Sequence, residues 1–321
     1  MGRKPRGPLE RSDYMKLTFF GTGTSIGVPI IGCGCQVCKS SDPRDKRSRS
    51  SALFEVEGLK ILVDCGPDFR MQMLRAGIGH LDGILLTHAH MDHTGGLDDV
   101  RALNYTDRHA AEIWCEERVL QDLRRVYPYA FANPKYPGSP EWRIHLIDEN
   151  PFAIVPSAAG RELEWVHDVG YGYRMPDGSF VPTPADPVYR AAAPGKGLTV
   201  TPVRGIHGKT PILGFRIGDI AYLTDMGHIP DEEFAKLEGL DHLTLNTVGY
   251  KPHHSHFYLD EALQVADRVG AKHTWLTHLS HHFPTHEVFC EDLRRMCSER
   301  GIHSDVQPAY DGLVLESSSL R

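Results

Sequence analysis

Residues 86–97, LTHAHMDHTGGL, place three imidazoles and one carboxylate within six positions, on His88, His90, Asp92 and His93. They directly follow the apolar residues 84–86, and a Gly-Gly pair comes after them, so the pattern predicts side chains at the end of a buried strand. Such a cluster is typical of a divalent-metal site. Alternation directs the first two histidines to one side, whereas Asp92 and His93 come from the turn. The loop therefore predicts two ions, separated by roughly 3.5–4 Å as in other two-metal sites.

Two ions need more ligands than this loop supplies, and three further apolar segments end in a suitable side chain. The segment 199–206 is followed by His207, 220–224 by Asp225 and 273–277 by His278. Each alone is a weak indication, because a single histidine at a strand end is more often structural. Together with the loop, they complete a predicted set of seven ligands.

At this point the chain resembles the metallo-β-lactamase fold superfamily of hydrolases. The resemblance rests on 17-LTFFGTGTSIGVP-29, 62-LVDCGPDFR-70, the HAHMDH box and the three strand-end positions, and it covers roughly residues 15–315. It implies an α/β (α+β) fold: the αββα sandwich, in which two mixed β-sheets are flanked by helices.

A second cluster of donors is the C-x-C-x-x-C sequence formed by Cys33, Cys35 and Cys38 within residues 32–40. Three thiols in six residues are dense enough for a zinc site rather than a disulfide framework. A fourth ligand is missing locally. His281 is the first candidate and His282 the alternative, and the expected zinc is structural, closing a knuckle-like loop.

This Cys loop with a downstream histidine resembles the PhnP-like branch, which contains cyclic phosphodiesterases associated with phosphonate breakdown. The branch also has a histidine near the scissile phosphate, in a P-H-x-x-H segment followed by a helix, and residues 252–270 fit that pattern. His256 is the expected residue, with His254 in reserve. The PqqB-like branch keeps the Cys loop without the full metal set, so the intact HAHMDH box argues against it.

The resemblance implies a dimetal hydrolase that cleaves a small phosphodiester, a cyclic phosphate above all, by attack of a metal-bridging hydroxide. The cofactors would be two divalent ions, Zn or Mn, besides the structural Zn. One ion would be held by His88, His90 and His207 and the other by Asp92, His93 and His278, with Asp225 bridging them. Asp92 and His256 are the catalytic candidates. His256 would stabilise the phosphoryl oxygens or protonate the leaving alkoxide, a role suited to a group titrating near pH 6.5.

Asp64 follows the apolar segment 60–63 and has two equally weighted interpretations. It accepts a hydrogen bond from a ligating imidazole, or it only caps the segment 67–77. The glycines of 21–27 do not match a dinucleotide fingerprint, which disfavours a NAD site.

Length and periodicity predict one domain over residues 15–321, preceded by a disordered basic arm at 1–14. Apolar residues at helical spacing predict helices at 116–126, 259–269 and 285–300. Strands are expected to begin at Lys16, Ser51, Lys60, Gly83, Glu112, Leu198, Leu213, Ile220, His242, Thr274 and Leu313. Residues 150–197, rich in Pro and Gly, are expected to be an irregular insertion. Either they cover a pocket as a lid, with Tyr171, Tyr173, Arg174 and Tyr189, or they form a solvated excursion.

The net charge and the composition limit the classes of partner that the protein is expected to bind. The net charge of −7 disfavours extended nucleic-acid binding, but it is compatible with a small-molecule phosphodiester. The sequence contains no membrane-length apolar run and no signal core, and its seven cysteines suit a reducing cytoplasm. A homodimer is compatible with the sequence. The alternatives in function are a tRNA 3′-processing nuclease and a lactonase or thioesterase of the same fold.

Overall fold

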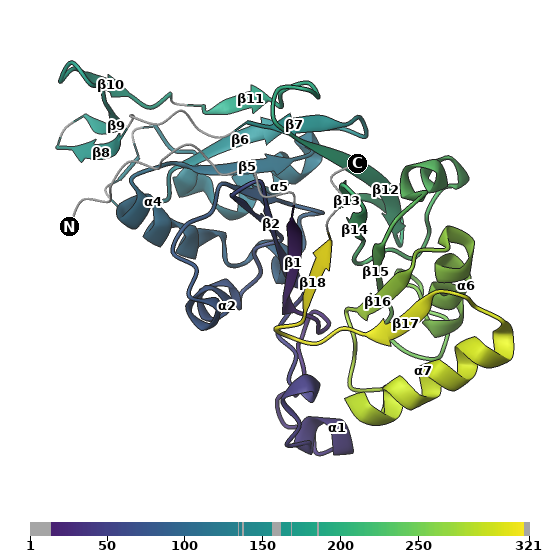
Figure 1. Cartoon of the computed structure of the whole chain (residues 1–321). Helices are drawn as coiled ribbons and strands as arrows, with labels where there is room; N and C mark the ends of the chain where they lie inside the picture. Colours follow the sequence, from purple (N-terminus) through teal and green to yellow (C-terminus); the bar gives the residue numbers. More distant parts are fainter. Residues whose placement is uncertain are drawn as a thin grey trace. The chain divides into compact units, whose positions relative to one another are not determined.

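The structure is a computed structural model that describes residues 14–133, 135–136, 138–155, 162–167, 169–184 and 186–317 (Figure 1). The predicted arm at 1–14 therefore lies outside the described residues, apart from Tyr14. The chain divides into two compact units, and each contains segments from distant parts of the sequence. The first unit holds residues 54–148 and 152–198, and the second holds 14–53, 149–151 and 199–317.

The first unit contains a sheet in which β11, β6, β5, β4 and β3 are consecutive neighbours and run parallel. Its elements are β3 (Leu59–Val63), α2 (Phe69–Ala76), β4 (Gly83–Leu85), α3 (Met91–Thr94), α4 (Arg101–Asp107), β5 (Ala111–Cys115), α5 (Glu117–Val126), β6 (Trp142–Leu146), β7 (Phe152–Ile154), β8 (Glu162–Val166), β9 (Gly170–Arg174), β10 (Phe180–Pro182) and β11 (Val188–Arg190), with 3-10 turns η2 (Leu97–Val100) and η3 (Pro128–Ala130). The residues of strand β2 (Ser51–Val56) are divided between the units, with 51–53 in the second and 54–56 in the first.

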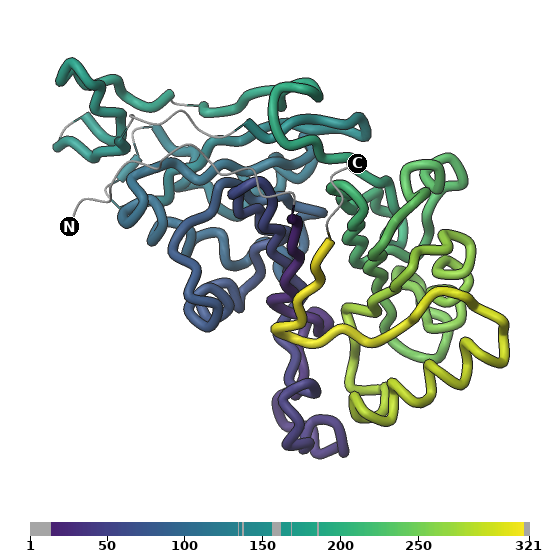
Figure 2. The backbone as a smooth tube through the Cα atoms, viewed as in Figure 1, coloured from purple at the N-terminus to yellow at the C-terminus, as the bar shows by residue number. Residues whose placement is uncertain are grey.

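The second unit contains a mixed sheet in the order β17-β16-β15-β14-β13-β12, in which the strands from β14 to β17 are parallel. Its elements are β1 (Met15–Gly21), α1 (Gln36–Lys39), η1 (Pro43–Asp45), β12 (Leu198–His207), β13 (Thr210–Ile217), β14 (Ile220–Tyr222), η4 (Asp231–Leu237), β15 (His242–Asn246), α6 (Leu259–Val269), β16 (His273–Thr277), α7 (His286–Arg300), β17 (Asp305–Pro308) and β18 (Val314–Ser317). In this unit β1 pairs antiparallel with β18, so the purple strand β1 lies beside the yellow strand β18 (Figure 2).

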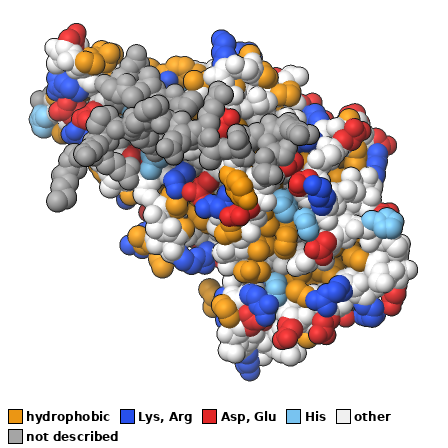
Figure 3. All heavy atoms as spheres, in the orientation of Figure 1, with side chains coloured by type: hydrophobic (Ala, Val, Ile, Leu, Met, Phe, Trp, Pro, Cys, Tyr) orange, Lys and Arg blue, Asp and Glu red, His pale blue; other side chains and the backbone are white. Residues whose placement is uncertain are grey.

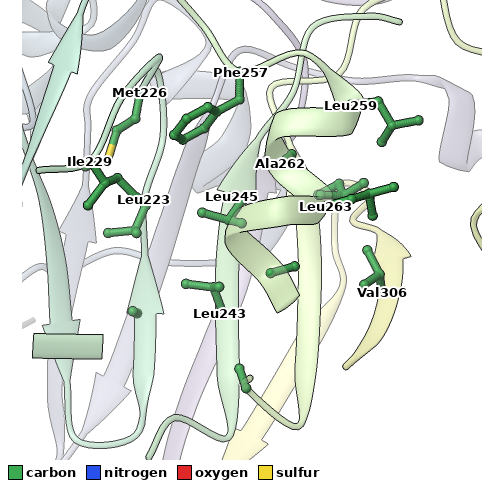
Figure 4. Close-up of a cluster of buried hydrophobic side chains, with 14 of the residues drawn as sticks. Leu223, Met226, Ile229, Leu243, Leu245, Phe257, Leu259, Ala262, Leu263 and Val306 are labelled. Atoms are coloured by element: carbon green, nitrogen blue, oxygen red, sulfur yellow. The ribbon is translucent and has the colours of Figure 1, made fainter. Parts of the chain in front are cut away.

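The core of the second unit forms where α6 covers the sheet. The helix buries Leu259, Ala262, Leu263 and Ala266 at helical spacing, and it ends at Gly270 in a left-handed conformation. Leu243 and Leu245 of β15 face the same cluster, as do Met226 and Phe257 (Figure 4). This packing holds the strand ends that carry the candidate ligands.

The expected irregular insertion at 150–197 is only partly irregular. Strands β8, β9 and β10 form an antiparallel three-stranded sheet, and β11 extends the parallel sheet next to β6. Alternation is present in the sequences ELEWV and GYGYR, but the surrounding Pro and Gly residues conceal it. Residues 156–161, 168 and 185 of this segment lie outside the described part of the chain.

Candidate metal centre

The predicted donors of the HAHMDH box lie together in the first unit, between β4 and η2. His88 is buried and His90 exposed, and their ring centroids are 4.6 Å apart, while His88 and His93 are 4.2 Å apart. Asp92 Oδ2 lies 3.3 Å from His93 Nε2. Two ligands about 2.0–2.2 Å from one ion are separated by roughly 3.0–3.4 Å at right or tetrahedral angles, so this pair fits a shared cation.

Asp64 contacts the box through two hydrogen-bonded routes. Its Oδ2 accepts from His93 Nδ1 at 2.7 Å, and its carboxylate also accepts from Thr87 N at 2.9 Å and from Thr87 Oγ1 at 2.9 Å. Because the Thr87 hydroxyl donates to Asp64, it is left to accept from His88 Nδ1 at 2.9 Å. Both rings thereby keep their proton on Nδ1 and direct the lone pair of Nε2 toward a metal.

These contacts favour the first interpretation of Asp64. The N-cap residue of α2 is Asp68, and the Asp64 carboxylate is instead fully buried against Thr87 and His93. Burial raises the pKa of the Asp64 carboxyl, and the adjacent His93 opposes that rise. Thr87, which carries the contact to His88, is a residue that sequence reasoning missed.

The second unit brings His207, Asp225 and His278 together with His256. His278 Nε2 lies 3.1 Å from Asp225 Oδ2, again the spacing of two ligands on one cation. His207 donates from Nδ1 to the carbonyls of Asp225, at 2.8 Å, and Ser255, at 3.0 Å, so Nε2 is the ring nitrogen that would bind a metal. One ligand atom from each of His207, Asp225 and His256 lies within 4.8 Å of the others.

His256 lies between two of these histidines. Its ring centroid is 4.6 Å from that of His207 and 4.6 Å from that of His278, and its Nδ1 is 3.9 Å from Asp225 Oδ2. Burial lowers the pKa of His256 to about 3, and the neighbouring His278 lowers it further. A pKa this low favours a neutral ring at neutral pH, and with it the expected stabilisation of phosphoryl oxygens over the expected protonation of the leaving alkoxide. The reserve candidate, His254, is exposed.

Three of these residues have an unusual main-chain conformation. Asp64, Asp225 and His278 each follow a strand, and their φ values are 61°, 61° and 55°. Most residues other than glycine adopt this left-handed region at a cost of about 1–2 kcal/mol, and aspartate tolerates it better than most. Its recurrence at candidate site residues is typical of functional sites.

The predicted thiol cluster forms within the second unit, and its fourth member is His281. The Nδ1 atom of His281 lies 3.3 Å from Cys33 Sγ, 3.6 Å from Cys35 Sγ and 3.7 Å from Cys38 Sγ. For a tetrahedral zinc with Zn–S of about 2.3 Å and Zn–N of about 2.0–2.1 Å, the sulfur-to-nitrogen edge is about 3.6 Å. The four residues therefore fit a structural zinc, and the structure brings His281 rather than His282 to the thiols.

The thiols differ in their tendency to ionise. A hydrogen bond from Cys38 N, at 3.4 Å, is the main cause that lowers the pKa of Cys35 to about 6. Burial raises the pKa of Cys38 to about 11, so binding of a metal there would expel a proton.

Of the four residues proposed to line a lid, Tyr171, Arg174 and Tyr189 are held by packing or pairing within the first unit. The Arg143 guanidinium lies over the Tyr189 ring, with its Cζ 4.9 Å from the ring centroid. Arg174 Nε forms an ion pair with Glu164 Oε2 at 2.9 Å. Tyr171 is buried. These contacts favour a folded surface element over a mobile cover.

Charged side chains of both signs are interspersed on the face drawn in Figure 3. In the described part of the chain, no helix is long and apolar enough to cross a membrane.

Comparison with known proteins shows the family to which the chain belongs. The family model described as beta-lactamase superfamily domain matches residues 60–279. The crystal structure of a diphosphatase from the PhnP family is 34% identical with a TM-score of 0.71, and the match covers 95% of this chain and 97% of that one. A ribonuclease Z of Streptomyces coelicolor is 27% identical over 291 residues, which are 83% of this chain and 90% of the relative.

A protein of Porphyromonas gingivalis named octanoyltransferase is 36% identical over 312 residues, which are 96% of this chain. The chain spans only 53% of that relative, about half its length. The expected αββα fold class is confirmed by the family match and by the PhnP-family structure. The chain belongs to the metallo-β-lactamase superfamily of metal-dependent hydrolases and is a PhnP-like member of it.

Proposed function

We propose that the protein hydrolyses a phosphodiester or diphosphate linkage in a small molecule, using two divalent cations, Zn or Mn. The seven proposed ligands are His88, His90, Asp92, His93, His207, Asp225 and His278. The observation that carries the proposal is the fixed tautomer of the histidines in both units: His88, His93 and His207 each commit Nδ1 to an oxygen acceptor and leave Nε2 for a metal. The similarity to a PhnP-family diphosphatase supports the phosphoryl substrate class.

When bound, the two cations supply a nucleophile from water at neutral pH and neutralise charge on the phosphoryl oxygens. The chain's own residues orient the ligands. Asp64 and Thr87 fix the rings of His88 and His93, and the carbonyls of Asp225 and Ser255 fix the ring of His207. His256, as a neutral imidazole, would donate a hydrogen bond to a phosphoryl oxygen rather than act as a cationic acid.

The structural zinc belongs to the same proposal. Cys33, Cys35, Cys38 and His281 would hold it. His281 lies three positions after His278, so the zinc would anchor the segment that leaves this ligand.

The test is a substrate profile of the purified protein loaded with Zn or Mn. The panel contains bis(p-nitrophenyl) phosphate, 2′,3′-cyclic nucleotides, ribosyl cyclic phosphates, dinucleoside diphosphates, lactones, thioesters and precursor tRNA. We expect turnover of a small phosphodiester or diphosphate, and its loss in His88→Ala and Asp225→Asn. Turnover of lactones or thioesters alone, or activity unchanged in His88→Ala, would contradict the proposal.

The Streptomyces ribonuclease Z, matched over 90% of its length, favours a tRNA 3′-processing nuclease as the second candidate. Cleavage of precursor tRNA with no turnover of small esters would select it. The octanoyltransferase name does not lead to a candidate, because the chain covers only half of that protein.

For His256→Ala we expect kcat to fall by roughly 10²-fold while KM changes little, because a donor aimed at developing charge acts mainly in the transition state. An unchanged kcat would remove His256 from the mechanism.

Three further expectations accompany the proposal. Residues 15–321 would unfold as one domain, which a single calorimetric transition would support. A homodimer would have twice the chain mass in light scattering. A cytoplasmic location would be visible by cell fractionation.

A further inference from the structure

Asn246, the last residue of β15, clamps the main chain next to a proposed ligand. Its side chain is fully buried. Asn246 Oδ1 accepts a hydrogen bond from Met226 N at 2.7 Å, and Asn246 Nδ2 donates to Met226 O at 2.9 Å. Met226 directly follows Asp225, so one amide group satisfies both polar groups of the residue beside the proposed bridging carboxylate.

The clamp acts at a point where regular structure has ended. Strand β14 ends at Tyr222, and Asp225 has a φ of 61°. Buried main-chain groups beyond a strand need other partners. A side-chain amide offers one donor side and one acceptor side in a single plane, whereas a carboxylate only accepts and a leucine does neither.

The clamped segment also carries other groups of the site. The carbonyl of Asp225 accepts from His207 Nδ1 at 2.8 Å, and the carbonyl of Met226 accepts from Phe257 N at 2.8 Å. Phe257 is the neighbour of His256, and its side chain packs with that of Met226 in one core cluster (Figure 4). A shift of residue 226 would thus move a carboxylate, the acceptor of an imidazole proton and the main chain beside His256.

We propose that Asn246 is a positioning residue that holds Asp225, and through it His207, in the geometry that binds the catalytic metals. This inference rests on the proposed function, in which both residues are ligands. Loss of such an orienting partner typically weakens metal binding by 10–100-fold.

The test compares Asn246→Leu and Asn246→Asp with a control on the same strand. Thr244 is also fully buried, and its hydroxyl has no hydrogen-bond partner among the described residues, so Thr244→Val removes a buried polar atom without touching the clamp. Mn²⁺ affinity is measured by electron paramagnetic resonance, and the structural zinc is counted by atomic absorption. We expect both Asn246 variants to keep the structural zinc and to bind Mn²⁺ 10–100-fold more weakly, while Thr244→Val binds it as the wild type does.

The outcomes separate the two proposals. A wild-type protein that binds no cation beyond the structural zinc overturns the proposed function. A wild type that binds Mn²⁺ at the catalytic sites, together with unchanged affinity in Asn246→Asp, overturns only the role of Asn246. If the Leu and Asp variants lose the structural zinc as well, Asn246→Ser decides, because it keeps a small polar group. Wild-type Mn²⁺ affinity in that variant overturns the inference, and a 10–100-fold loss with zinc retained supports it.

Discussion

Gly66 offers a direct way to displace the HAHMDH box without changing any proposed ligand. A Cβ atom at this position would lie 2.0 Å from the carbonyl oxygen of Asp92 and 3.1 Å from its carbonyl carbon. Real Cβ atoms essentially never approach within 3.0 Å of such an atom. The Gly66→Ala substitution therefore forces the two main-chain segments apart by about 1 Å, an overpacking change that typically costs about 1–3 kcal/mol.

The displacement would be transmitted to the donors because the two segments are hydrogen-bonded through Cys65, the residue next to Gly66. Cys65 N donates to the carbonyl of His93 at 2.7 Å, and Gly96 N donates to the carbonyl of Cys65 at 2.9 Å. A misplacement of about 1 Å can reduce an enzymatic rate on the order of 10²-fold. For Gly66→Ala we therefore expect kcat/KM for bis(p-nitrophenyl) phosphate to fall about 100-fold, together with weaker Mn²⁺ binding.

Gly79 is the matched control. A Cβ there has nothing within 4 Å among the described residues, and its φ is outside the left-handed region. Gly79→Ala should keep wild-type activity. Its free energy of unfolding should be unchanged or higher by up to about 1 kcal/mol, because alanine restricts the conformations of the unfolded chain. Urea unfolding and kcat/KM, measured on both variants, test the reasoning. Wild-type activity and stability in Gly66→Ala would refute it.

Three other perturbations have defined outcomes. Cys35→Ser should remove the structural zinc and lower Tm while sparing the catalytic pair, and an unchanged zinc content by atomic absorption would exclude the knuckle. Asp64→Asn, which retains tolerance of the left-handed conformation, should weaken Mn²⁺ binding by 10–100-fold because the Nδ1 proton of His93 loses its carboxylate; unchanged affinity in a titration would contradict the orienting role. Burial lowers the pKa of His286 to about 4, below the value of about 6.5 in an unfolded chain, with Arg47 as a second cause. The unfolded state therefore binds more protons between these values, so the stability contribution is present above pH 6.5 and lost as pH falls toward 4. Urea unfolding should have a flatter pH dependence over this range in His286→Gln, and an identical slope would count against the assignment.

The strands and the candidate ligands were predictable where polarity changes abruptly along the chain. Asp225 and His278 end apolar runs, and the HAHMDH box follows another, so local pattern was sufficient to name them. Strands β3, β12 and β16 begin at Leu59, Leu198 and His273, within one residue of the prediction.

Long-range contacts were not predictable in the same way. The partner of Asp64 depends on the parallel pairing of β3 with β4, in which Val63 is opposite Leu85, and this register brings Asp64 to Thr87. The choice between His281 and His282 likewise depends on how the chain turns after β16. Asn246 ends an apolar strand as Asp225 does, but nothing local indicates that its amide reaches Met226.

The left-handed conformations at Asp64, Asp225 and His278 create a conflict between optimising stability and optimising activity. Glycine would relieve a main-chain penalty of about 1–2 kcal/mol at His278 and a smaller one at the two aspartates, but it would also delete a side chain that the proposed site needs. Directed evolution for heat resistance alone would therefore be drawn toward substitutions at these positions that abolish turnover. Screens for thermostable variants of this protein should accordingly be run with a simultaneous requirement for hydrolysis.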